Sequence, residues 1–109
     1  MIASPYRYAI LRELRGEPEP PLREQIARLA PADLTLVEGY KWEPLPKLEV
    51  YRPALGRAPL YAGDPLVVAV ASDAPRPADA QGPAWLDLNA TEEVLTWLMG
   101  WMEATAKSA

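Results

Sequence analysis

The sequence contains neither cysteine nor histidine among its 109 residues. Without cysteine it can form no disulfide and no thiolate metal site, and without histidine it lacks the commonest metal ligand and general base. A Ser-His-Asp or Cys-His mechanism therefore cannot be carried out by this chain alone. No carboxylate cluster with metal-ligand spacing stands out in the sequence, which also disfavours a small hydrolase or transferase.

Long basic runs and long apolar runs are also missing. Eleven Lys and Arg against fifteen Asp and Glu give a net charge of −4, so no positive face is predicted and nucleic acid is not an expected partner. No segment reaches the roughly 18 apolar residues of a membrane span, and residues 1–5 contain no signal-peptide core. We expect a cytoplasmic protein without membrane contact, and residues 1–109 have the length of one domain.

Proline is abundant instead, with 13 residues that mark where regular structure must stop or turn. Glu17 and Glu19 alternate with three of the prolines, and we interpret them as solvated loop charges rather than as a catalytic pair. The clusters that divide the chain are Pro18, Pro20 and Pro21, then Pro44 and Pro46, then Pro75 and Pro77.

Hydrophobic spacing predicts three elements in the first 40 residues. Residues 6–14 fit an alternating strand or a short helix, and we favour the strand. Apolar residues at i, i+4 and i+7 predict a short amphipathic helix over residues 22–29, between Pro21 and Pro31. The nearly continuous apolar run over residues 33–39 predicts a strand that is buried on both faces.

The remaining sequence predicts two further strands and a closing helix. Residues 47–52 alternate, with Leu48 and Val50 against Glu49 and Tyr51, which predicts a strand with one solvated face. The prolines before it favour an edge position. Residues 66–71 have the composition of a buried parallel strand, and a brief apolar stretch follows at residues 84–88.

The last helix is predicted over residues 90–105, with Asn89 as N-cap and Glu92 as the acidic residue that reaches back. Its apolar stripe is typical of a core face or a dimer contact rather than of a cofactor site. The stripe consists of Val94, Trp97, Leu98, Trp101 and Met102. Together these elements predict an α/β fold with a mostly parallel sheet, an edge β-ribbon and a C-terminal helix.

Two segments are more specific than composition alone explains. The first is Asp-Leu-Thr-Leu-Val-Glu-Gly-Tyr-Lys at residues 33–41, followed by Pro-Lys-Leu-Glu-Val at 46–50 and by Arg52. The second is Val-Ala-Val-Ala-Ser-Asp-Ala-Pro at residues 68–75. In order and spacing, and over nearly the whole chain, they resemble MobB proteins, the accessory GTP-binding factors of molybdopterin-guanine dinucleotide biosynthesis. The resemblance implies part of a three-layer, P-loop NTPase-like fold with GTP and Mg²⁺ as cofactors.

The resemblance assigns Glu38, Gly39 and Lys41 to a nucleotide and magnesium site. An acidic residue at the carboxyl end of a buried parallel strand is where a P-loop fold places the group that meets Mg²⁺ or its waters. We therefore expect Glu38 to meet Mg²⁺ through water, and Lys41 to reach an anionic phosphate. The alternative for Glu38 is a carboxylate that caps the turn at Gly39.

The resemblance assigns Ser72 and Asp73 to recognition of the base. A carboxylate beyond the end of the strongest strand can accept the two ring-edge N–H groups of guanine, with Ser72 supporting the base or the loop. The alternative is that Asp73 only begins the turn before Pro75. No catalytic residue is assigned.

The phosphate-binding loop of the family pattern has no counterpart in this sequence. No Gly-x-x-x-x-Gly-Lys segment occurs, so tight GTP binding by this chain alone is not expected. Met1 falls where the family pattern lies inside a strand, which suggests a C-terminal fragment, a split gene or a short paralogue.

Two functions remain open from the sequence. One is an accessory protein that positions GTP for the guanylyltransferase (MobA-like) by electrostatics. The other is an interaction module that docks on that enzyme or on a molybdenum-insertion protein. In either case exposed sheet predicts a homodimer, with Leu48, Val50, Trp97 and Trp101 as interface residues.

Overall fold

A computed structural model describes residues 1–108 and contains two compact units, Met1–Leu36 and Val37–Ala109. Within residues 1–108 no helix combines the length and the apolar character needed to cross a membrane.

The first unit holds a two-stranded ribbon and one short helix. Strands β1 (Ile2–Ala3) and β2 (Tyr8–Ala9) pair antiparallel, so the predicted strand over residues 6–14 is confirmed only at Tyr8–Ala9. The hydroxyl oxygen of Ser4 holds the connecting turn by accepting from the backbone N–H of Arg7. Helix α1 (Leu22–Ala27) begins directly after Pro21, as predicted, because proline is compatible with a helix N-terminus.

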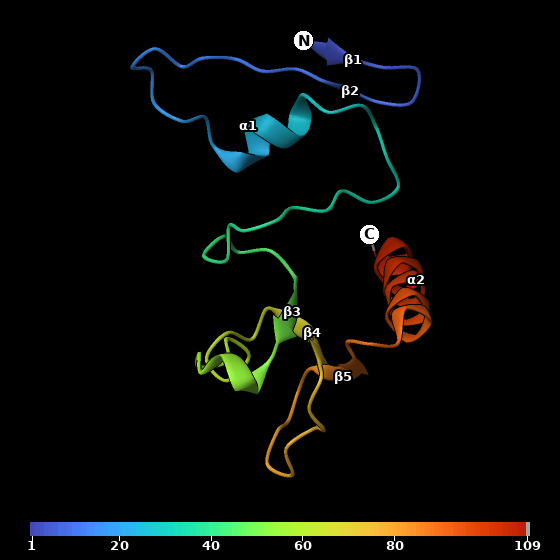
Figure 1. Cartoon of the computed structure of the whole chain (residues 1–109). Helices are drawn as coiled ribbons and strands as arrows, with labels where there is room; N and C mark the ends of the chain where they lie inside the picture. The colour runs from blue at the N-terminus through green and yellow to red at the C-terminus, as the bar shows by residue number, and fades with distance from the viewer. Residues whose placement is uncertain (109) are drawn as a thin grey trace. The chain divides into compact units, whose positions relative to one another are not determined.

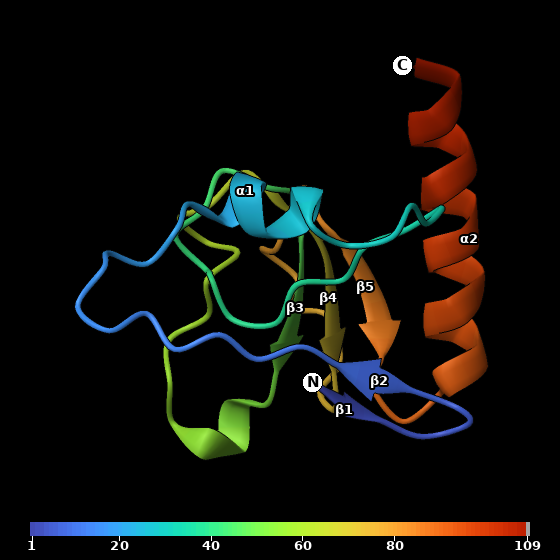
Figure 2. The ribbon, with the colours of Figure 1, turned by 90° about the horizontal axis from the view of Figure 1, so that it is seen from above.

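The second unit is built on a parallel sheet of three strands in the order β3-β4-β5. The strands are β3 (Lys47–Tyr51), β4 (Val67–Ser72) and β5 (Ala84–Asp87), and helix α2 (Thr91–Ser108) follows. Figure 2 shows the three arrows side by side and α2 running back in the opposite direction next to β5. The α/β class, the mostly parallel sheet and the edge position of β3 are confirmed.

The core of this unit lies between the sheet and α2. Ala69 and Ala71 of β4 and Leu86 of β5 are buried, and Val94 and Trp97 of α2 pack against them. Small side chains on β4 let the helix approach closely, while the β-branched valines of the same strand favour extended backbone. The helical stripe predicted from sequence therefore faces the core through its first half.

The opposite face of the sheet is covered by residues 52–66, which we call the crossover segment. It connects β3 to β4 and contains one short 3-10 helix, Pro53–Leu55 (Figure 1). Glu49 of β3 fastens this segment, because its carboxylate accepts from the backbone N–H groups of Leu60 at 2.7 Å and Tyr61 at 2.8 Å. An irregular segment held by a charged side chain thus takes the place of the helix that usually connects two parallel strands.

A second polar contact joins the start of β3 to the end of the crossover segment. Lys47 Nζ lies 3.1 Å from Asp64 Oδ2, with both side chains largely covered. The backbone N–H of Leu66, which donates to the Asp64 carboxylate at 2.9 Å, lowers the pKa of Asp64, and the Lys47 ammonium lowers it further. The ionised carboxylate is therefore favoured by the fold.

Three aromatic rings fill the space beneath the same segment. Tyr51, Tyr61 and Trp85 meet edge to face, with ring centroids between 5.6 and 6.5 Å apart. The side chains of β3 are consequently distributed unlike a simple amphipathic strand. Glu49 and Tyr51 are half-buried, whereas Val50 is 61% exposed, so the solvated face is the apolar one.

The start of α2 is fastened by a different carboxylate from the one predicted. The helix begins at Thr91 and continues to Ser108, and Glu93, rather than Glu92, reaches back to accept from the backbone N–H of Asp87 at 3.1 Å. The Asp87 carboxylate in turn accepts from the N–H of Asn89 at 2.9 Å, which fixes the turn between β5 and α2.

The buried strand predicted over residues 33–39 is wrong for this structure. These residues have no strand conformation, and Leu36 is 77% exposed. A central parallel strand needs backbone partners along both edges, and no strand within residues 1–108 pairs with this segment. Its apolar composition is therefore insufficient to make it a strand.

Candidate functional site

The carboxyl ends of β3 and β4 bring an arginine and an aspartate together. Tyr51 and Ser72 are partners in the parallel register, so the next residues, Arg52 and Asp73, emerge opposite each other. Arg52 Nε donates to Asp73 Oδ2 at 3.2 Å, and the two side chains are 53% and 30% exposed. This edge is where parallel α/β sheets bind ligands.

The loop after β4 is held firmly behind this pair. Ser72 is buried, and its hydroxyl oxygen accepts from the backbone N–H of Ala74 at 3.1 Å. The Ala74 carbonyl accepts from the indole N–H of Trp85 at 2.9 Å, and the Ser72 carbonyl accepts from the N–H of Leu88 at 2.9 Å. Ser72 therefore supports the loop that carries Asp73, while its burial keeps the hydroxyl from solvent.

Glu38, Gly39 and Lys41 lie in a tight turn before β3. Gly39 has φ +75° and Tyr40 has φ +50°, so the chain takes two consecutive left-handed residues here; this conformation is unstrained for glycine but not for tyrosine. The backbone therefore bends sharply just after Glu38, at the position where the sequence predicted the end of a strand.

The predicted magnesium and phosphate residues do not join the Arg52–Asp73 pair. Glu38 is exposed, and the Lys41 ammonium lies 5.1 Å from the centre of the Trp42 ring, in cation–π contact. No hydrogen bond or ion pair within residues 1–108 connects Glu38 or Lys41 to Asp73. The described residues also contain no group of three or more Asp, Glu, His or Cys that could hold a metal.

The predicted interface residues fall on two surfaces. Leu48 and Val50 leave β3 on the apolar side of the edge strand and are 36% and 61% exposed. Trp97 packs against the core of the sheet, and the Trp101 ring stacks on the Trp97 ring with centroids 6.3 Å apart. The exposed interface candidates are therefore the two β3 residues.

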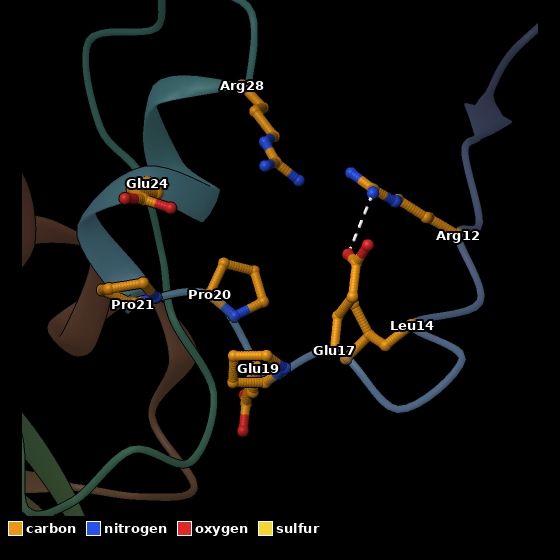
Figure 3. Close-up of a pocket in the computed structure, with 9 residues that line it drawn as sticks. Arg12, Leu14, Glu17, Glu19, Pro20, Pro21, Glu24 and Arg28 are labelled. Atoms are coloured by element: carbon orange, nitrogen blue, oxygen red, sulfur yellow. Dashed lines mark hydrogen bonds and ion pairs between the residues drawn. The ribbon is translucent and has the colours of Figure 1, made fainter.

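The first unit has a surface hollow of about 320 Å³. Figure 3 shows the side chains of Arg12 and Arg28 pointing toward each other across it. Glu17 pairs with Arg12 at 3.1 Å, and both side chains are open to solvent. Glu17 therefore behaves as the solvated loop charge predicted from its proline neighbours.

Sequence reasoning missed the role of Arg52. The sequence places it at the end of the predicted strand over residues 47–52 and among the residues of the family resemblance, but it does not indicate its partner. Its contact becomes predictable only when the parallel register of β3 and β4 is known, because residues beyond paired strand ends are then neighbours.

A parallel α/β sheet with charged side chains beyond its carboxyl ends defines a protein class that takes ligands at this edge, consistent with a P-loop-like fold. Residues 1–73 match the family model described as "Molybdopterin guanine dinucleotide synthesis protein B" (MobB). The chain belongs to this family, as the sequence resemblance indicated.

Two curated relatives extend the similarity to most of the chain. Both carry the name "Molybdopterin-guanine dinucleotide biosynthesis adapter protein". The protein from Escherichia coli (strain K12) is 35% identical over 106 residues, which cover 94% of this chain and 59% of the relative. The protein from Haemophilus influenzae (strain ATCC 51907 / DSM 11121 / KW20 / Rd) is 33% identical over 106 residues, covering 94% and 55%. The chain thus spans less than two thirds of the length of these relatives.

Proposed function

We propose that this protein is a non-enzymatic, cytoplasmic accessory factor in molybdenum cofactor biosynthesis, and that it holds a guanine nucleotide at the carboxyl edge of its sheet. Membership of the MobB family and the adapter name of both relatives support the pathway and the accessory role. The observation that carries the nucleotide part is the position of Asp73, which lies beyond the central strand and is fixed by Arg52 and by the supported loop behind it.

The chemistry of such a site is electrostatic positioning. A carboxylate held in place accepts ring N–H groups without reorganising, and this fits a protein that presents a nucleotide to a guanylyltransferase better than one that transforms it. Glu38 is proposed to meet Mg²⁺ through water, and Lys41 to meet phosphate, from the turn before β3, where neither residue contacts the Arg52–Asp73 pair. Because no phosphate-binding loop occurs in the sequence, any GTPase activity would require that loop to be supplied.

Calorimetric titration of the folded protein with GTP and Mg²⁺ tests the nucleotide site, with ATP as comparison. We expect guanine-selective binding that disappears in Asp73→Ala and persists in Asp79→Ala, which removes an exposed carboxylate from the same loop. An absence of heat from a folded sample with either nucleotide would contradict the nucleotide part and leave the accessory role to protein contacts alone.

A second candidate function is docking on a protein partner, either the guanylyltransferase or a molybdenum-insertion protein. The specific observation in its favour is the apolar side of the edge strand β3, where Val50 is 61% exposed. Edge strands with exposed apolar side chains readily pair with other chains. We include a homodimer in the proposal, formed through this same edge.

A pull-down with purified guanylyltransferase separates the two candidates. If the protein holds a nucleotide, Asp73→Ala should abolish nucleotide-dependent capture. If it docks on the enzyme through β3, Val50→Asp should abolish capture with or without nucleotide. Met99→Asp is the matched control for Val50→Asp, because Met99 is similarly exposed, at 53%, but lies on α2 away from the strand edge.

A further inference from the structure

The Arg52–Asp73 ion pair at the carboxyl edge leaves some of its hydrogen-bond donors and acceptors available to a ligand. Arg52 contacts Asp73 through Nε alone, and only the Oδ2 oxygen of the carboxylate is engaged. Within residues 1–108 the two terminal nitrogens of Arg52 and the Oδ1 oxygen of Asp73 make no hydrogen bond. The pair therefore presents donors directly beside an acceptor.

This arrangement of donors and acceptors is complementary to one edge of guanine and of pterins. The pyrimidine ring of guanine carries a carbonyl, a ring N–H and an exocyclic amino group along one edge, and a pterin carries the same 2-amino-oxo edge. A carboxylate can accept from the ring N–H and the amino group together, while a guanidinium nitrogen donates to the neighbouring carbonyl. Adenine presents an amino group where guanine has the carbonyl, so two donors would face each other.

On the basis of the proposed nucleotide site, we propose that Arg52 is the specificity-determining residue of that site. It donates to the ring carbonyl of a 2-amino-oxo pyrimidine while Asp73 accepts from the N–H groups. The shared ligand chemistry is that of guanine and of pterins.

Two features of the surroundings favour this arrangement. The indole N–H of Trp85 fixes the Ala74 carbonyl at 2.9 Å, so the loop that carries Asp73 is ordered before a ligand arrives. Arg52 leaves the end of a hydrogen-bonded strand, which limits its backbone freedom in the same way. Since an exposed ion pair contributes little to stability, substitution of Arg52 is expected to leave the fold intact.

The test measures dissociation constants by calorimetry for GMP, IMP and AMP, and for 6-hydroxymethylpterin. IMP keeps the carbonyl and the ring N–H of GMP but lacks the amino group, which only Asp73 reads. We expect wild type to bind GMP about tenfold more tightly than IMP, with AMP weakest. Arg52→Met should weaken GMP and IMP by the same factor, about tenfold, and so preserve their ratio.

Asp73→Ala should instead remove the binding of GMP and IMP alike, because both ligands lose the acceptor of the ring N–H. Arg57→Met, which removes an exposed arginine from the crossover segment, serves as the control and should change nothing. If Arg52→Met also abolishes the GMP to IMP ratio, Arg52 merely orients Asp73 and the inference is overturned; unchanged constants in Arg52→Met overturn it too.

The outcomes also separate this inference from the proposed function. Binding of 6-hydroxymethylpterin but of no guanine nucleotide, with the same dependence on Arg52, supports the edge-reading pair and identifies a pterin as its ligand, against the nucleotide site. GMP binding that is lost in Asp73→Ala but indifferent to Arg52→Met keeps the nucleotide site and overturns the role of Arg52. Failure of all four ligands to bind wild type overturns both.

Discussion

Single carboxylates decide much of the local structure of the second unit. Glu49 looks like an ordinary surface charge in the sequence, because alternation with apolar neighbours is typical of a solvated strand face. The structure turns Glu49 inward, where it holds two backbone N–H groups of the crossover segment. Sequence spacing could not predict this contact, since it depends on a segment that has no regular structure.

We predict that Glu49→Gln destabilises the fold by about 2 kcal/mol, because an amide group offers one acceptor where two backbone N–H groups need partners. Urea unfolding followed by circular dichroism measures the change. Glu103→Gln, on the exposed side of α2, is the control and should unfold like wild type. Equal midpoints for both variants would show that the crossover segment is held by its aromatic contacts instead.

Asp64 gives the fold a defined dependence on acid. Its pKa lies below the usual value of 3.8, chiefly because of the Leu66 N–H and then because of Lys47, so ionised Asp64 stabilises the folded state. This contribution is complete above the usual value and is lost as the pH falls through the lowered one.

Accordingly, the difference in unfolding free energy between wild type and Asp64→Asn should be largest above about pH 4 and should shrink in more acidic solution. Denaturant titrations at a series of pH values measure it. Asp79→Asn removes an exposed carboxylate elsewhere in the chain and provides the comparison. A difference that grows on acidification would contradict the lowered pKa of Asp64.

At the scale of elements, the success of prediction followed how much each element depends on distant partners. Helix α2 and strand β4 were found from local pattern, since an amphipathic period and a valine-rich run persist in any context. Residues 33–39 have an equally apolar run, but no strand among the described residues 1–108 pairs with them, and they do not form a strand. Strand β5 appeared in the sequence only as a brief apolar stretch.

The two faces of α2 should respond differently to truncation. Trp97 packs against the buried residues of β4 and β5, whereas Met99 is 53% exposed. We predict that Trp97→Ala costs about 2 to 3 kcal/mol of unfolding free energy, because a half-buried indole leaves the core. Met99→Ala should stay within about 0.5 kcal/mol of wild type. Chemical denaturation of both variants decides whether the core lies where the structure places it.

For the whole molecule, the proposed homodimer depends on the edge of β3 and not on the acidic surface of the protein, whose net charge is −4. A buried carboxylate in the interface would be costly, so Val50→Asp should convert the dimer to a monomer. Light scattering across micromolar concentrations measures the mass. Met99→Asp adds the same charge elsewhere and should leave the dimer intact, and a monomeric wild type at all concentrations would remove the dimer from the proposal.

The parallel pairing of β3, β4 and β5 also constrains the order in which the chain can fold during synthesis. No two neighbouring strands of this sheet are joined by a tight turn, so β3 must wait without partners until β4 has left the ribosome. Each pairing then requires closure of a long loop, and the entropy lost in that closure precedes any stabilising backbone contact, which slows folding. During that interval the apolar side of β3 is available to any passing chain, including a newly made copy of the same protein.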